Sequence, residues 1–339
     1  MQKKLYYDEA KQRRLSKRKG AAMKKYDVTA IGELLIDFTE NGVSAQGNPM
    51  LEANPGGAPC NVLAMLHKLG HRTSFIGKVG RDHFGDLLEA AAKEAGIDTT
   101  GLCRDDKVHT TLAFVHTAPD GDRDFSFYRN PGADMMLSVE DVNTELVHDC
   151  RIFHFGTLSM TDEICCKATR YAIEEAEKAG AILSFDPNLR EPLWKTLDEA
   201  REQVAYGMEH CKILKISDNE IQWFTGEEDF DKGIRILQKK YQIPLILLSL
   251  GKDGSRAYCG KTRVEVPGVL RPDTIETTGA GDTFCACVLH YVLTHGFKDY
   301  TIAELTEMLR FANTAASIIT TRKGALRVMP TLEEIQREL

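Results

Sequence analysis

The chain has 339 residues, of which 42% are hydrophobic and 27% are charged, and its net charge is −7. This balance is typical of a globular protein with a sizeable core. There is no run of about 18 apolar residues and no apolar leader near the N-terminus, so we expect no transmembrane helix and a cytoplasmic location.

Positive charge is concentrated at the N-terminus. Residues 1–25 hold ten of the 43 Lys/Arg and two of the 50 Asp/Glu, so the remainder of the chain is strongly acidic. An acidic body argues against nucleic acid as the main partner. We interpret residues 1–25 as a basic, poorly ordered extension, although such a segment could also bind nucleic acid or anionic lipid.

The nine cysteines do not follow the spacing of a metal site. No Cys-x-x-Cys pair occurs, and the vicinal Cys165-Cys166 and the Cys285-x-Cys287 pair do not suit structural zinc. We expect reduced thiols that pack as small hydrophobic side chains.

The first predicted strand runs from Tyr26 to Ile36 and is followed directly by Asp37. An apolar run of this kind indicates a buried strand of a parallel sheet. Ligands bind at the C-terminal ends of such strands, so Asp37 is a candidate ligand-binding residue. The alternative is that Asp37 only caps a turn.

A polar turn precedes the next helix, which is expected over residues 62–69. Gly56 and Gly57 allow the backbone to approach another group closely, and Asn61 offers both a donor and an acceptor. These groups suit the hydroxyls of a polyol better than a phosphate. The alternative is a tight turn without a binding role.

A glycine-bearing loop over residues 77–85 follows a short strand at 73–76. Its spacing matches neither a Walker A loop nor the dinucleotide-binding fingerprint. We therefore assign this loop a structural role.

Two short strands, 108–117 and 124–128, follow without an intervening helix and are joined by a turn at Pro119–Asp122. They interrupt an otherwise alternating pattern of strands and helices. We predict a small β lid drawn from about residues 38–53 and 100–131, which would cover a site and exclude water.

Arg129 follows the last of these strands. It would contribute a polar contact from the lid, or alternatively a surface salt bridge.

From residue 151 onward strands and helices alternate regularly. The expected strands are 151–155, 181–185, 212–216 and 245–250, followed by the hairpin-like strands 255–259 and 262–266. This alternation implies a mostly parallel sheet with right-handed crossovers. Polar residues cluster after the second of these strands, in Asp186–Arg190. Glu220 follows the third, where it could reach a Mg²⁺ shell through water or act as a helix N-terminal acid.

The stretch Thr277–Phe284 places two glycines and Asp282 at the start of an apolar helix. The glycines and the helix N-terminus would direct backbone N–H groups at an anion, with a carboxylate beside it. A base next to an anion site is the arrangement that phosphoryl transfer to a hydroxyl requires.

Two separated signatures together resemble those of the PfkB-type (ribokinase-like) carbohydrate kinases, over residues 26–339. The first is Gly56–Asn61 with Gly77–Gly85 downstream. The second is Thr277–Asp282, where Glu276 replaces the leading Asp of the family. The resemblance implies a single domain with a ribokinase-like three-layer α/β/α fold, a mostly parallel sheet and a small β lid.

Within the family the chain is most similar to bacterial-type fructokinases, in Phe127–Met135 and Asp186–Trp194. The second segment is shared in part with 2-keto-3-deoxygluconate kinases. Ser217 departs from the family's Asn-x-x-Glu motif, so a role there in holding Mg²⁺ would rest on Glu220 alone.

The resemblance also implies residue roles. Asp282 would be the general base, and the N–H groups of Gly279, Ala280 and Gly281 would hold the charge on the transferred phosphoryl group. The sugar would be bound by Asp37, Gly56, Gly57, Asn61, Arg129 and Asn188. The nucleotide ATP would be bound by Ser249, Gly251, Gly254 and Asn313. Mg²⁺ would accompany ATP, a monovalent cation such as K⁺ is common near the anion site in relatives, and lid strands often pair across a homodimer.

The expected function is therefore the ATP-dependent phosphorylation of fructose to fructose 6-phosphate. The alternatives are a 2-keto-3-deoxygluconate kinase, another sugar or nucleoside kinase of the ribokinase family, and a catalytically inactive sugar-binding regulatory protein. Small molecules are the expected partners, without nucleic acid or membrane.

Overall fold

The computed structural model describes residues 24–117 and 123–339. The expected turn at Pro119–Asp122 and residues 1–23 of the basic extension lie outside these ranges. Within them, a large sheet has the strand order β13-β12-β11-β10-β9-β8-β1-β4-β5. Its strands are β1 (Tyr26–Ile31), β4 (Thr73–Gly80), β5 (Ile97–Asp105), β8 (Cys150–Phe155), β9 (Ile182–Phe185), β10 (Ile213–Ser217), β11 (Leu245–Ser249), β12 (Ser255–Cys259) and β13 (Thr262–Val266). Neighbouring strands are parallel except where β12 pairs with β11 and β13.

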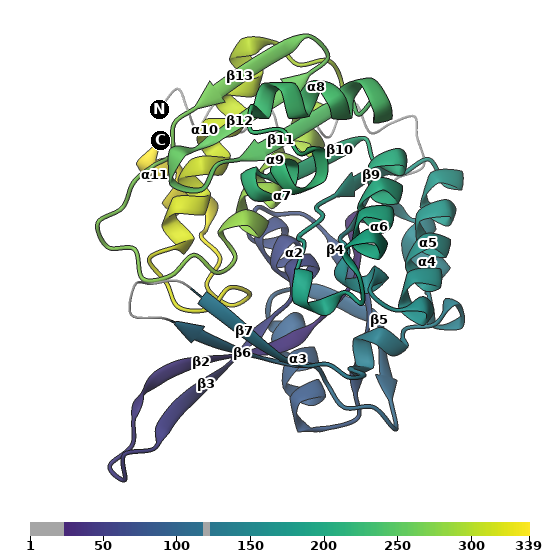
Figure 1. Ribbon diagram of the computed structural model, residues 1–339, viewed down its shortest axis with the longest axis vertical. Helices are drawn as coiled ribbons and strands as arrows, with labels where there is room; N and C mark the ends of the chain where they lie inside the picture. The colour runs from purple at the N-terminus through teal and green to yellow at the C-terminus, as the bar shows by residue number, and fades with distance from the viewer. Residues whose placement is uncertain (1–23, 118–122) are drawn as a thin grey trace.

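Helices cover both faces of the large sheet (Figure 1). One face carries α2 (Ala58–Lys68), α3 (His83–Glu94), α9 (Ala280–His295), α10 (Ile302–Ile319) and α11 (Leu332–Glu338). The other carries α4 (Thr144–His148), α5 (Glu163–Lys178), α6 (Leu197–His210), α7 (Asp218–Thr225) and α8 (Phe230–Tyr241). The three-layer α/β/α architecture expected from the sequence is thus confirmed. Among the described residues, no helix combines the length and apolar character needed to cross a membrane.

The smaller sheet has the order β3-β2-β6-β7 and projects from one end of the large sheet (Figure 1). Its strands are β2 (Leu35–Val43), β3 (Pro49–Gly56), β6 (Leu112–Thr117) and β7 (Arg123–Tyr128). Two expectations differ from this arrangement. The apolar run 26–36 is not one strand, because the chain leaves the large sheet after Ile31 and enters the small sheet at Leu35. Residues 100–105 belong to β5 of the large sheet and not to the lid.

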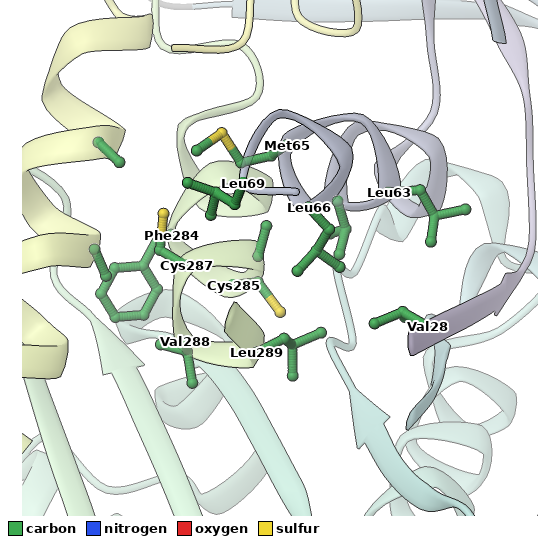
Figure 2. Packing of buried hydrophobic residues seen from close by; sticks show 14 of the residues in the cluster. Val28, Leu63, Met65, Leu66, Leu69, Phe284, Cys285, Cys287, Val288 and Leu289 are labelled. Atoms are coloured by element: carbon green, nitrogen blue, oxygen red, sulfur yellow. The ribbon is translucent and has the colours of Figure 1, made fainter. Parts of the chain in front are cut away.

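Helix α9 is buried on nearly every side, because it lies between α2, α10 and the sheet. Figure 2 shows Leu66 of α2 near Cys285 and Leu289 of α9, and Leu63 of α2 on the side of Val28 of β1. This packing fixes the start of α9 relative to the start of α2. The same contact therefore determines how two distant signatures of the sequence meet.

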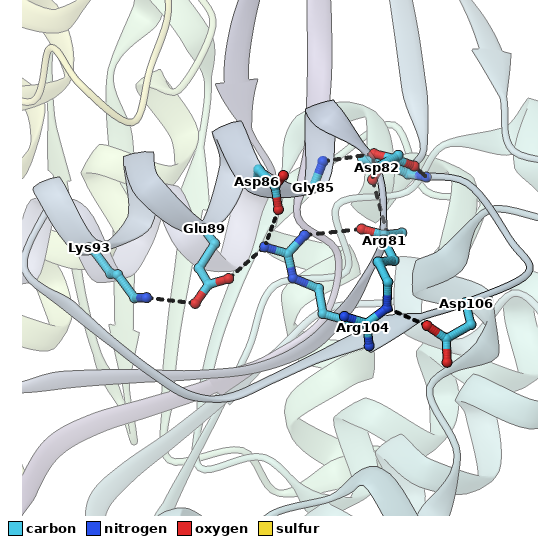
Figure 3. A network of polar contacts seen from close by, with 10 residues as sticks. Arg81, Asp82, Gly85, Asp86, Glu89, Lys93, Arg104 and Asp106 are labelled. Atoms are coloured by element: carbon cyan, nitrogen blue, oxygen red, sulfur yellow. Dashed lines mark hydrogen bonds and ion pairs between the residues drawn. The ribbon is translucent and has the colours of Figure 1, made fainter.

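Residues 77–85 form the end of β4 and the start of α3, in a network of ion pairs (Figure 3). Asp82 caps α3 by accepting a hydrogen bond from the N–H of Gly85 at 2.8 Å. Arg104 binds the carboxylate of Asp86 at 3.1 Å and that of Glu89 at 2.5 Å. These contacts tie α3 to β5, in agreement with the structural role predicted for this segment.

Candidate active site

A cavity of about 340 Å³ lies between the small sheet and the start of α9. Seven residues predicted from the sequence line it: Asp37, Gly57, Asn61, Asn188, Gly279, Gly281 and Asp282. The lining also includes Leu35 of β2, Val115 of β6 and Phe127 of β7. The small sheet thus forms one wall of the cavity, as a lid would.

The start of α9 forms the opposite wall. Its N-cap is Gly279, which adopts a left-handed conformation (φ +77°) and offers no side chain to the first-turn N–H groups. A Cβ atom there would also lie 2.8 Å from the Cβ of Ala325, so only glycine fits. The Ala280 N–H donates to the carbonyl of Thr277 at 3.2 Å, so the following N–H groups of the first turn and the positive end of the helix are the groups that could bind an anion. Ala280 lies in this turn without lining the cavity.

Asp282 is on the first turn of α9 and contacts Asn61 of α2. The Asn61 Nδ2 group donates a hydrogen bond to Asp282 Oδ2 at 2.8 Å. Burial raises the pKa of Asp282, while the hydrogen bond from Asn61 and the positive charges of Lys215 and Arg190 oppose that rise. Asn61 Oδ1 has no partner among the described residues, although the side chain is buried. This oxygen is available to accept a hydrogen bond from a ligand hydroxyl beside the Asp282 carboxylate.

Asp37 is the third residue of β2, in the small sheet. Burial raises the pKa of Asp37 to about 7, the nearby Arg190 opposes this, and the charges of Asp282 and Glu276 add to it. Gly56 does not line the cavity but packs behind Asp37, since a Cβ there would lie 2.5 Å from the Asp37 carboxylate. Gly57 adopts a φ of +128°, and a Cβ on it would meet the carbonyl oxygen of Glu33 at 2.5 Å.

Asn188 reaches the cavity from a loop that is held at three points. Its own backbone is left-handed, with φ 45°. Before it, Asp186 pairs with Lys215, and the Thr157 hydroxyl donates to the carbonyl of Pro187 at 2.6 Å. After it, the N–H of Leu189 donates to Glu220 at 2.8 Å. These bonds hold the loop so that Asn188 and Arg190 face the cavity.

Several cavity residues were not assigned by sequence reasoning: Glu33, Asn54, Arg190, Lys215 and Glu276. Lys215 could have been singled out from the sequence, because it is a lysine in the otherwise apolar segment Ile213–Ile216 of β10. Glu33 is likewise a buried acid, bonded to the N–H of Ala58 at 2.8 Å, and burial raises its pKa to about 7.

Arg129 does not contact the cavity, so the expected sugar contact is replaced by a buried salt bridge. Its side chain is 2% exposed and binds the Asp134 carboxylate at 2.7 Å. It also donates to the Thr161 hydroxyl at 2.8 Å and to the carbonyl of Leu158 at 2.9 Å. Because burial removes the guanidinium from solvent, all of these partners are needed to hold it. Arg129 therefore joins the end of β7 to the segment before α5.

Glu220 has both carboxylate oxygens engaged in the described structure. One accepts from Leu189, and the other accepts from the Ser217 N–H at 2.8 Å and the Ser217 hydroxyl at 2.9 Å, which forms a capping box on α7. Burial alone would raise the pKa of Glu220, but the Lys215 charge and these hydrogen bonds lower it. Its geometry is that of a helix N-terminal acid. Contact with Mg²⁺ through water stays a prediction.

The four predicted nucleotide residues lie outside this cavity. Ser249 ends β11, and Gly251 and Gly254 form the following turn with φ of +55° and +105°. Asn313 of α10 is buried, accepts from the Ser255 hydroxyl at 2.8 Å, and donates to the carbonyls of Val266 and Pro267 at 3.2 Å. These bonds join α10 to the end of β13. Adenine binding near Asn313 stays a prediction.

The family model described as pfkB family carbohydrate kinase matches residues 25–332. A probable fructokinase-2 of Arabidopsis thaliana is 40% identical over 310 residues, which cover 90% of this chain and 93% of the relative. The chain belongs to the pfkB family of carbohydrate kinases. The resemblance in the two signatures is thereby confirmed.

Two solved structures of this family are also similar. A fructokinase with bound ATP from Xylella fastidiosa is 31% identical, with a TM-score of 0.83, covering 92% of this chain and 98% of that one. A fructokinase from Vibrio cholerae, in a form with bound fructose, ADP and calcium ion, is 27% identical. Its TM-score is 0.81, and the match covers 91% of this chain and 97% of that one.

Proposed function

We propose that this pfkB family protein is an ATP-dependent fructokinase that converts fructose to fructose 6-phosphate. The observation that carries the proposal is the hydrogen bond between Asn61 and Asp282 at the first turn of α9. A sugar hydroxyl held by Asn61 would lie next to both a base and an anion site. The relatives named fructokinase, one of which holds fructose and ADP, support fructose as the sugar.

The reaction follows from these positions. Asp282 accepts the proton of the attacking hydroxyl, whose oxygen forms a new bond to the γ-phosphorus of ATP. The bond from that phosphorus to the bridging oxygen breaks, and its electron pair leaves with ADP. The N–H groups of Gly279 and Gly281 would stabilise the transferred group, whereas that of Ala280 is bonded to the Thr277 carbonyl. Phe127 and Val115 of the small sheet exclude water, so that transfer to the sugar is favoured over hydrolysis.

A substrate panel with ATP and Mg²⁺ tests the proposal. Fructose should give a kcat/KM at least about 10-fold above those of ribose, glucose, a nucleoside and 2-keto-3-deoxygluconate, since discrimination of hydroxyl patterns is expected from a polar site. A strong preference for any other sugar would reject fructose while leaving the kinase reaction in place.

Arg190 makes 2-keto-3-deoxygluconate the second candidate. A guanidinium that lines the cavity could pair with the carboxylate of this acid, which fructose lacks. The catalytically inactive sugar-binding protein remains the non-enzymatic alternative. Calorimetric binding of fructose without any turnover of ATP would support it.

No group of three His, Cys, Asp or Glu that could hold a metal is found among residues 24–117 and 123–339. We therefore propose that Mg²⁺ is held mainly by the phosphates of ATP and by water.

Val43, Met50 and Leu51 of the small sheet are exposed, which supports a homodimer through the lid. Light scattering during gel filtration would test that assembly, and the requirement for K⁺ can be tested in the same kinase assay.

A further inference from the structure

Lys215 is a charged residue in the middle of an apolar strand. In β10, the sequence Ile213-Leu-Lys-Ile216 places three buried aliphatic side chains around it, and the lysine side chain is only 8% exposed. Burying an ammonium group is costly unless it is paired. A lysine at such a position needs a partner or a task that an apolar residue could not supply.

One partner is Asp186, at the end of the neighbouring parallel strand β9. The Lys215 Nζ atom lies 3.1 Å from Asp186 Oδ1 and 3.0 Å from Oδ2. Burial alone would lower the pKa of Lys215, but the carboxylates of Asp186, Glu220 and Asp282 raise it. These carboxylates therefore favour the protonated form of Lys215, which lines the cavity.

The ammonium group also lies against the first turn of α9. A Cβ atom on Gly281 would be 3.4 Å from Lys215 Nζ, so the lysine occupies the space beside the backbone of this turn. Lys215 lines the same cavity as Gly279 and Asp282. A cation at the positive end of a helix is unfavourable by itself. The arrangement becomes favourable when an anion binds between them.

The other charged side chains around Asp282 do not take the place of Lys215 beside the first turn of α9. Asp37 and Glu276 line the cavity as acids, and Glu220 is bonded to Ser217 and Leu189. Arg190 is the second cation of the cavity, and its charge acts on Asp37 as well as on Asp282. Within the described residues, Lys215 is the cation next to the anion-binding turn.

We propose that Lys215 is a further catalytic residue, whose ammonium group neutralises the phosphoryl group as it passes from ATP to the sugar at the start of α9. Asp186 is its positioning residue. This inference deepens the proposed function and rests on it. Lys215 exchanges no proton in the step: the hydroxyl proton goes to Asp282, and the electron pair of the broken phosphorus–oxygen bond goes to ADP.

The test compares Lys215→Met with the matched control Lys212→Met, an exposed lysine just before the same strand. Lys215→Met should lower kcat by about 100-fold or more, since removing one electrostatic contact to the transition state commonly has this effect. The calorimetric Kd for the sugar should change by less than about 3-fold, and Lys212→Met should behave as wild type. A kcat within about 3-fold of wild type for Lys215→Met would overturn the proposal.

Two further variants distinguish the effect of losing the Lys215 charge from the effect of a misfolded protein. Because Lys215→Met leaves Asp186 buried without its partner, the pair is also removed together in Lys215→Met/Asp186→Leu. This double variant should fold, as judged by its melting curve, and should still lose kcat. In Lys215→Ala, ethylammonium should restore part of kcat, whereas n-propanol should not. A near-normal kcat in the double variant, or equal rescue by the neutral alcohol, would refute a role for the charge.

The wild-type protein is assayed on the sugar panel first. Absence of turnover on fructose with turnover on another sugar would reject the fructokinase proposal only. The Lys215 variants are then measured with the sugar that is phosphorylated. An unchanged kcat in them would reject the Lys215 inference only.

Discussion

Asn61 and Asp282 are 221 residues apart in the sequence, and their side chains are joined by a hydrogen bond of 2.8 Å. Each residue belongs to the first turn of a helix, and the two helices, α2 and α9, pack along their apolar faces. The hydrophobic core therefore brings the first signature to the second. The proposed catalytic arrangement depends on this packing as much as on the two polar residues.

Replacing Asp282 with Asn should abolish most of the transfer without removing the sugar site. We expect kcat to fall by about 10²–10⁴-fold, because an amide cannot accept the hydroxyl proton, while sugar binding by calorimetry changes little. Asp198→Asn is a matched control, since Asp198 is an exposed aspartate in the first turn of α6. Near-normal turnover of Asp282→Asn would show that another group is the base.

Replacing Asn61 with Ala should change the pH dependence of kcat/KM. Asp282 must be ionised to act as a base, so activity is lost as the pH falls through the pKa of this residue. The Asn61 hydrogen bond lowers that pKa, and its removal should move the acidic limb to higher pH. KM for the sugar should also rise. The control Asn219→Ala, at an exposed position on α7, should leave the acidic limb and the sugar KM unchanged. An acidic limb at the wild-type pH in Asn61→Ala would show that the Asn61 hydrogen bond does not set the pKa of the base.

The glycine-bearing start of α9 and the position of Asp282 on its first turn could be predicted from the sequence, because their determinants are local. Thr277–Asp282 contains the glycines, the acid and the helix start in six consecutive residues. The alternation of strands and helices after residue 151 likewise predicted the parallel sheet, since each strand–helix–strand unit corresponds to one crossover between parallel strands.

The features that sequence reasoning missed depend on contacts between distant segments. The apolar run 26–36 continues past Gly32, so hydrophobicity could not show that the chain changes sheets there. Lys215 is 29 residues from Asp186, and their pairing requires β9 and β10 to be neighbours. Arg129 was expected to contact the sugar from the lid or to form a surface salt bridge, because nothing in the sequence places Asp134 and Thr161 around it.

Replacing Asp37 with Asn should stabilise the sugar-free protein at high pH. In the folded state the pKa of Asp37 is about 7, above its ordinary value of 3.8. The folded protein thus retains a proton that the unfolded chain has lost, and the free energy of unfolding falls as the pH rises from about 4 to about 7. We expect Asp37→Asn to be more stable than wild type by roughly 1–3 kcal/mol at pH 8, with the difference vanishing near pH 4. Urea unfolding at the two pH values measures this, and an equal difference at both would argue against titration of Asp37.

Replacing Gly57 with Ala should destabilise the fold. The residue has a φ of +128°, and a Cβ atom would meet the Glu33 carbonyl at 2.5 Å. We expect a loss of roughly 2–3 kcal/mol in the free energy of unfolding, from backbone strain and the clash together. Gly180→Ala is the control, because its φ is +72° but no atom lies within 4 Å of the added Cβ. A loss in Gly57→Ala no larger than that of the control would mean that the clash is relieved by movement of Glu33.

Replacing Glu220 with Gln separates its two predicted roles. The carboxylate accepts from the N–H groups of both Leu189 and Ser217, and a Gln side chain offers only one accepting oxygen to these donors. The loop that carries Asn188 should loosen, so we expect a higher sugar KM and an unchanged Mg²⁺ concentration for half-maximal activity. Ser217→Ala removes only the hydroxyl of the capping box, and it should reduce stability by about 1 kcal/mol while leaving the sugar KM unchanged. A higher Mg²⁺ requirement with unchanged sugar binding in Glu220→Gln would instead support contact with the metal ion through water.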